Sequence, residues 1–180
     1  MTSYIQLLDS SNNKLFNNKG QPSFTPQSTY DQTVSQSIAL GVPISSYSLS
    51  FANNATPDSS KFNPGKISFS GLDLTRNFDQ WSPFIFNRLA SGTTFKTLIL
   101  VNFSNTGAGG GNRIMSVLTF SNVLLVNQNL MSGGDGVATE SLQFMYGKVQ
   151  MGYQPVDASG KAGNPVQADW DLFVNKGSVS

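Results

Sequence analysis

The sequence contains no cysteine and no histidine. Without cysteine, the chain has no disulfide framework, no thiolate nucleophile and no thiolate metal ligand. Without histidine, it lacks the usual general base near neutral pH and the commonest metal ligand. Few catalytic designs survive the loss of both residue types. We therefore expect a protein without enzymatic activity, with no catalytic residues, no metal site and no cofactor.

Charge and long apolar runs are also scarce. Charged residues make up 12% of the 180 residues and the formal net charge is +1, where a typical soluble domain has roughly twice that charged fraction. A near-neutral chain is not drawn to a phosphate backbone, so nucleic acid is not an expected partner. Low charge also leaves little repulsion between copies, which permits self-association.

The longest apolar runs, such as residues 98–101, are about four residues long and too short to cross a membrane. The N-terminal residues lack the basic region and the apolar run of a signal peptide. We expect no membrane insertion, synthesis in the cytoplasm and, if the protein leaves the cell, export by a dedicated machine.

Many short segments have the periodicity of β-strands. Apolar residues alternate with serines over 44–51 and 67–70, which predicts strands with one apolar face and one small, polar face. Residues 9–43 and 52–65 are polar and broken by glycine and proline; we interpret 52–65 as a loop. Further strands are expected at 4–8, 96–103, 114–126, 142–153 and 170–174. About eight strands in one domain over residues 1–180 predict an all-β fold, a barrel or a sandwich.

One short helix is expected within the β-rich pattern. Ser82 is a suitable N-cap, Pro83 is favoured at the first helical position, and Gly92 is placed to end the helix. The buried stripe of this helix is expected to consist of Phe84, Ile85 and Leu89. A helix of about two turns must be stabilised by packing.

The strand over 142–153 changes phase in its middle. Its first apolar residues are Leu142, Phe144 and Tyr146, and the later ones are Val149, Met151 and Tyr153. The change falls at Gly147, where a β-bulge would turn the strand and keep its apolar side inward.

No short motif points to chemistry. The glycine-rich residues 106–112 precede a strand, whereas a phosphate-binding loop would precede a helix, so a hairpin connection is favoured. Asp169 and Asp171 flank Trp170, and solvated surface or a contact between subunits is the favoured interpretation. The serine faces have no histidine partner, and pairing with Lys66 is a remote alternative. These faces could be exposed to solvent or could line a wide, wet channel.

Residues 65–176 resemble the haemolysin-coregulated protein (Hcp) family, the tube proteins of the bacterial type VI secretion system. The resemblance is in the order and spacing of several segments rather than in one motif. These segments are residues 72–76 with Ser82 and Pro83, residues 120–126, the strand from Glu140 to Pro155, and residues 166–171.

The resemblance implies a two-sheet β-barrel with one helix on its side. It also implies six-membered rings of identical copies that stack into a tube, which a contractile sheath propels and whose lumen carries effectors. Expected partners are further copies, effectors, and the sheath, spike and baseplate proteins, with secretion or injection into target cells. By position, the candidate lumen-facing residues are Ser46, Ser48 and Ser50. Residues 52–65 match the loop that family members use between rings, which makes the inter-ring candidates Asn53, Asn54, Ser59, Lys61 and Phe62.

Two departures from the family keep other functions open. Residues 9–43 do not match and form a divergent insertion, and the tryptophans of the family's second strand are replaced by Tyr47, Leu49 and Phe51. A phage-type tail tube subunit of related fold is one alternative. A secreted, non-enzymatic binding module is another, in which Trp81 and Trp170 would stack on sugars, although core or interface roles are favoured for both.

Overall fold

A computed structural model describes the protein at residues 2–16, 34, 38, 41–63, 65–105, 112–132, 136, 138–155, 157 and 162–180. Most of these residues lie in antiparallel strands, and the helix that the sequence predicts is α2 (Ser82–Ala90). The all-β fold with one short helix at the barrel's side is therefore confirmed, with helical backbone also at Val34 and Ile38.

Six successive pairings close the strands into a barrel. In order around the barrel, the strands are β1 (Thr2–Leu8), β9 (Thr94–Asn105), β10 (Asn112–Ser132), β11 (Ala138–Met145), β8 (Leu72–Asn77), β3 (Ser46–Ser48) and β2 (Val42–Ile44), which returns to β1. Only Ser45 separates β2 from β3, and its N–H donates to the carbonyl oxygen of Thr75 at 2.8 Å. The strand predicted over 44–51 is thus interrupted, because β2 pairs with β1 whereas β3 pairs with β8.

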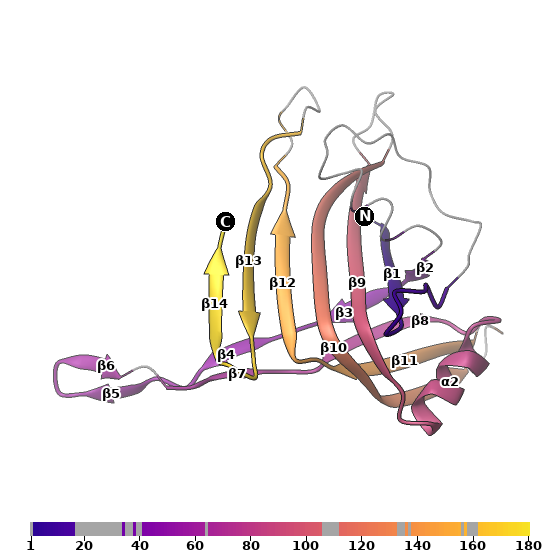
Figure 1. The fold of residues 1–180 in the computed structure, drawn as a ribbon, viewed down its shortest axis with the longest axis horizontal. Helices are drawn as coiled ribbons and strands as arrows, with labels where there is room; N and C mark the ends of the chain where they lie inside the picture. Colours follow the sequence, from indigo (N-terminus) through magenta and orange to yellow (C-terminus); the bar gives the residue numbers. More distant parts are fainter. Residues whose placement is uncertain are drawn as a thin grey trace.

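Three further strands extend the barrel sheet from β10. They are β12 (Lys148–Tyr153), β13 (Val166–Asp171) and β14 (Lys176–Val179), and we call them the extension (Figure 1). β12 falls within the strand predicted over 142–153, whereas a single strand over 170–174 was predicted where β13 and β14 lie. Residues 172–175 instead form the turn between β13 and β14.

The bulge expected at Gly147 lies on the opposite strand. β11 and β12 pair with β10 in one continuous register, since Leu124 faces Met145 and Ser121 faces Lys148. The register shift falls on β10, between Leu125 and Asn127. The apolar phase does change at Gly147, but Met151 and Tyr153 are exposed and of the later residues only Val149 enters the core.

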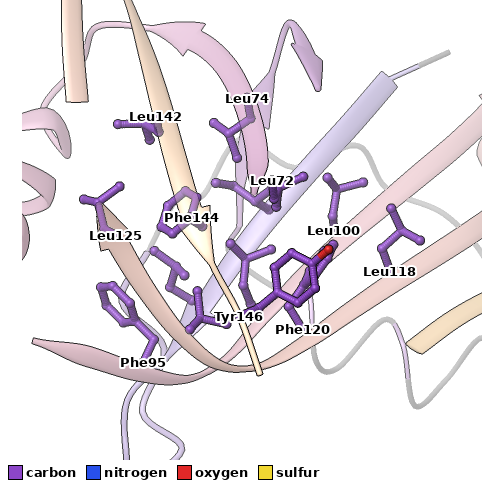
Figure 2. Close-up of a cluster of buried hydrophobic side chains, with 14 of the residues drawn as sticks. Leu72, Leu74, Phe95, Leu100, Leu118, Phe120, Leu125, Leu142, Phe144 and Tyr146 are labelled. Carbon is purple, nitrogen blue, oxygen red and sulfur yellow. The ribbon is translucent and has the colours of Figure 1, made fainter. Parts of the chain in front are cut away.

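The apolar run at residues 98–101 is explained by two cores on opposite faces of β9. Leu98 and Leu100 belong to the main core inside the barrel (Figure 2), and Ile99 and Val101 belong to a second cluster. Val34 and Ile38 are part of that second cluster. A strand buried on both faces is continuously apolar rather than alternating. Val34 and Ile38, which lie within residues 9–43, therefore help to cover the outer face of the barrel sheet at β9.

The helix differs from the prediction at its start and on its buried face. Trp81, not Ser82, is the N-cap residue, and Ser82 is already helical. Ile85 is buried and Leu89 packs against the main core, but Phe84 is 57% exposed. Gly92 ends the helix as predicted, with φ of 61° and its N–H donating to the carbonyl oxygen of Leu89.

The segment 52–65, expected to be a loop, is the outer part of a β-hairpin. β4 (Phe51–Asn53) pairs with β7 (Ile67–Phe69), and β5 (Thr56–Asp58) pairs with β6 (Lys61–Asn63). We call these four strands the arm, which points away from the barrel and past β14 (Figure 1). All residues of β4, β5 and β6 are exposed, so the sequence needs no apolar alternation over 52–65. For this reason the strands could not be predicted from the sequence pattern.

Candidate assembly surfaces

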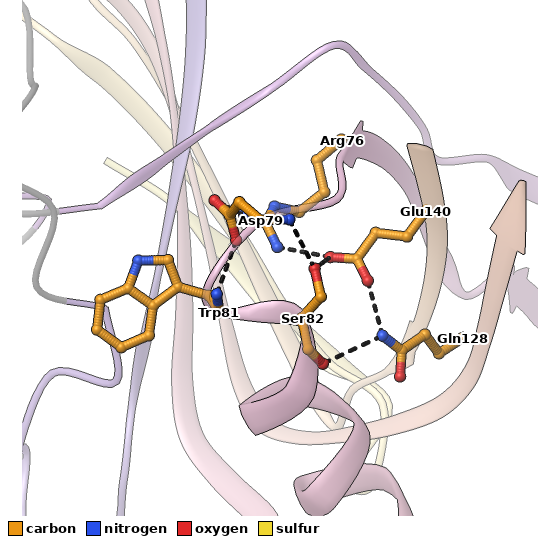
Figure 3. A network of polar contacts seen from close by, with 6 residues as sticks. All are labelled: Arg76, Asp79, Trp81, Ser82, Gln128 and Glu140. Atoms are coloured by element: carbon orange, nitrogen blue, oxygen red, sulfur yellow. Dashed lines mark hydrogen bonds and ion pairs between the residues drawn. The ribbon is translucent and has the colours of Figure 1, made fainter. Parts of the chain in front are cut away.

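A buried polar network joins α2 to the barrel (Figure 3). Arg76 on β8 donates to Glu140 on β11 at 2.5 Å and to Asp79 at 2.5 Å. Glu140 also accepts from the Ser82 hydroxyl at 2.9 Å and from the Gln128 amide at 2.7 Å. Arg76 and Glu140 are almost fully buried. Every oxygen of Glu140 is thus engaged by a neighbouring side chain, which makes this network an anchor for the helix rather than a reactive site.

Asp79 also fixes the start of the helix. One of its oxygens accepts the backbone N–H of Trp81 at 2.8 Å, while the other pairs with Arg76. Negative charge just before the first turn of a helix also suits the helix dipole. Asp73, on β8, accepts from Gln143 on β11 and takes no part in the network. Glu140 is the only glutamate in the chain, but its position relative to Arg76 and Gln128 follows no local motif.

The described part of the chain offers little for catalysis. It contains no group of three acidic residues that could hold a metal ion, and none of its helices could span a membrane. Burial raises the pKa of Tyr146 to about 12, so its phenol stays neutral inside the barrel. Trp81 and Trp170 both pack against the main core, which does not favour sugar stacking.

The candidate lumen residues lie along one exposed edge of the barrel. Ser46, Ser48 and Ser50 are exposed, with Ser46 facing Thr75 and Ser48 facing Asp73 across the strand pair. The residues between them turn the other way. Leu49 packs against the main core, and the Tyr47 hydroxyl accepts from Asn102 at 2.9 Å. The predicted alternation therefore produces a surface of small hydroxyls.

The five candidate inter-ring residues all lie on the arm, but they differ in what they do there. Asn53 accepts the N–H of Gly65 at 3.0 Å, and a Cβ at Gly65 would lie 2.0 Å from the carbonyl oxygen of Asn54. These two asparagines therefore shape the middle of the arm. Ser59 lies in the tip turn, where its N–H donates to Asp58. Lys61 and Phe62 are exposed to solvent on β6, and the exposed fraction of Phe62 is 75%.

The extension has two chemically different faces. On one face, the Lys148 ammonium pairs with Asp169 at 2.8 Å, and Gln150 donates to Gln167 at 3.0 Å. The opposite face continues the inner surface of the barrel and is apolar. Its cross-strand rows are Val149, Trp170 and Gly177; Met151, Ala168 and Val179; and Tyr153 and Val166.

The base of the arm covers only the lower end of this apolar face. An open pocket of about 220 Å³ lies between the two, with Phe51, Ile67 and Phe69 on the arm side. Its extension side is formed by Val149, Met151, Ala168, Asp169 and Trp170. We call it the arm-base pocket. The pocket could not be predicted from the sequence, because its lining residues come from four separate strands, β4, β7, β12 and β13.

Comparison with known proteins gives one family and one fold. The family model described as "Type VI secretion system effector, Hcp" matches residues 32–153. No curated protein matches the chain. A structure of a type six secretion system protein superposes with a TM-score of 0.73 at 22% identity, covering 98% of this chain and 99% of the other.

Two other solved structures are similar as well. Hcp1 from Salmonella typhimurium has a TM-score of 0.62 at 18% identity, covering 99% of this chain and 100% of its own. A chain of the anti-feeding prophage baseplate has a TM-score of 0.50 at 12% identity, covering 83% of this chain and 91% of its own. At such identities the structures establish a shared fold.

Proposed function

We propose a function on the premise that this chain belongs to the Hcp family of the type VI secretion system, whose model matches 32–153. Hcp proteins are structural tube proteins, and this chain is a subunit of such a tube. The finer proposal is that six copies form a ring, that rings stack along one axis, and that the stack carries effectors in its lumen. Sheath, spike and baseplate proteins would be its partners, and the target cell its destination.

The arm is the observation that supports stacking. A two-stranded hairpin with exposed residues on both faces is marginal on its own in water. The outer strands of the arm project beyond β14 (Figure 1) and pair only with each other, so they do not contribute to the barrel. In a stack of rings the arm would contact the next ring and transmit force along the axis.

The serine surface supports the proposal for the lumen. Ser46, Ser48 and Ser50 present small, uncharged hydroxyls that would hold a passing protein weakly and release it. Absence of enzymatic activity belongs to the same proposal, because a conduit needs surface rather than chemistry.

The first experiment is to measure the mass and shape of the purified protein by light scattering and negative-stain microscopy. We expect rings with a central hole at roughly six times the chain mass. The second experiment uses a shortened variant. In this variant Asn-Gly replaces residues 54–66 and joins β4 to β7 through a two-residue turn. This variant should still form rings but should not stack. Normal tube growth by the shortened variant would contradict the role of the arm.

A tail-tube role in a phage-like particle is the second candidate, and the similarity to the prophage baseplate chain favours it. Both functions share the ring and the stack. Co-purification from the source cell distinguishes them, since the two systems would bring different sheath proteins.

A further inference from the structure

We propose that Phe62 at the tip of one copy's arm inserts into the arm-base pocket of a second copy, and that this contact joins successive rings. The inference rests on the proposed function for its direction along the tube. It adds the identity of the surface that receives the arm, which the family assignment does not specify.

Phe62 is the one large apolar residue on the outer part of the arm. From Thr56 to Asn63 its neighbours are polar or charged except for Pro57, which lies directly opposite it in the strand pair. A phenyl ring that is 75% exposed on a polar hairpin buries little of its surface against its own chain. Aromatic residues of this kind are the usual anchors of protein interfaces.

The arm-base pocket has the matching size and chemistry. Its volume is about 220 Å³ and its lining is almost wholly apolar, with aromatic rings from Phe51, Phe69 and Trp170. For comparison, a cavity of about 150 Å³ lined by similar side chains binds benzene. The pocket therefore has room for the ring of a phenylalanine.

Phe62 is not among the residues that line the pocket of its own chain. It lies five residues along the arm from the pocket residue Ile67, which an extended strand spans over roughly 16 Å. The paired strands β5 and β6, of which β6 carries Phe62, lie past β14 on the side away from the barrel (Figure 1). The contact must therefore form between copies.

A projection on one end that fits a pocket at another place makes a heterologous contact. Such contacts produce open-ended assemblies when the rotation between copies does not close. A stack of rings is an assembly of this kind. The low net charge of +1 leaves little repulsion against it.

Because the chain has no native cysteine, cysteines introduced at chosen positions can be cross-linked specifically. Copies carrying Lys61→Cys, an exposed position beside Phe62 on β6, are mixed with copies carrying Met151→Cys, an exposed residue in the pocket, and treated with a short bismaleimide. We expect a cross-linked heterodimer that is at least tenfold more abundant than when Met151→Cys is replaced by Asn87→Cys, an exposed control on α2. Copies with both Lys61→Cys and Met151→Cys should give a ladder of multimers.

A second measurement does not depend on cross-linking. Phe62→Ala should raise the protein concentration at which rings stack by more than tenfold, while Ser59→Ala at the same tip should leave it unchanged. Rings without the specific cross-link, and with normal stacking of Phe62→Ala, would overturn the inference and leave the ring function intact. Cross-linking without rings would support the contact and contradict the ring. Monomers without cross-links at high concentration would contradict both.

Discussion

The barrel and the arm use the same strand geometry but bury very different amounts of surface. In the barrel, strands such as β9 contribute side chains to cores on both faces. In the arm, all residues of β4, β5 and β6 are exposed. The barrel is therefore stabilised by its own packing, whereas the outer part of the arm leaves its large apolar side chain, Phe62, 75% exposed. Substitutions in the two regions should affect different properties.

The largest expected effect is on the barrel core. Phe120→Ala removes a ring that is 1% exposed and that contacts Tyr146 edge to face, with 4.8 Å between the ring centroids. We expect a loss of about 3–5 kcal/mol in the free energy of unfolding, measured by urea denaturation. Phe62→Ala is the matched control on the arm and should change it by no more than about 0.5 kcal/mol. Equal losses in both variants would contradict the contrast between barrel and arm.

The next largest effect is expected in the buried network. Glu140→Gln removes the charge that faces Arg76 while preserving the shape of the side chain. Breaking a buried ion pair from one side costs about 3 kcal/mol, partly offset here because Asp79 still pairs with Arg76. Urea denaturation measures the loss, and the far-ultraviolet circular dichroism signal of α2 should weaken first. Lys148→Met, at an exposed pair, should leave the midpoint nearly unchanged.

A smaller effect is expected at the end of the helix. Gly92 has φ of 61°, and a side chain in that conformation costs about 1–2 kcal/mol. A Cβ there would meet no other atom within 4 Å, so the cost of Gly92→Ala is conformational rather than steric. Thermal unfolding should show a modest drop in Tm. A substitution by Asn, which tolerates the left-handed region, should recover part of the loss.

The smallest effect concerns pH and the polar face of the extension. The hydrogen bond from Lys148 lowers the pKa of Asp169 below its ordinary value of 3.8, and the same bond raises the pKa of Lys148 above 10.5. Stability from the acid is present above the unfolded pKa and is lost as pH falls through the folded one. Stability from the lysine is present below 10.5 and is lost as pH rises above its folded pKa.

The pair should therefore give a slight plateau of stability from weakly acidic to weakly basic pH. Lys148→Met should flatten the acidic limb of a plot of unfolding midpoint against pH. High salt should have a similar effect on the native protein, since both groups are partly exposed to solvent. A steeper acidic limb in the variant would contradict this assignment.

Much of the fold could be predicted from local patterns. Alternation over 67–70 and the run at 98–101 correspond to β7 and β9, and Gly92 ends α2 as expected. Residues 52–65 were predicted as a loop, whereas the structure has paired strands there. Without a buried face, a strand leaves no period-two signal in the sequence.

The candidate surfaces were predictable only where a single segment forms them. The serines of 46–50 and Phe62 follow from one stretch of chain. The arm-base pocket does not, because Phe51, Phe69 and Trp170 are brought together by pairing across the sheet. The network of Arg76 and Glu140 joins residues 64 positions apart, and no local spacing relates them.

The sequence by itself determined the class of the protein: short alternating strands, one helix bounded by Pro83 and Gly92, and the family resemblance. The tertiary structure alone decided which apolar residues are covered. Met151, Tyr153 and Phe84 are exposed even though their periodicity suggested burial. The physical reason is that periodicity assigns a residue to a face of its own element, while burial depends on whether another element packs over that face. On the apolar face of the extension, no element among the described residues packs over Tyr153, Val166 and Val179, and there a second copy has room to bind.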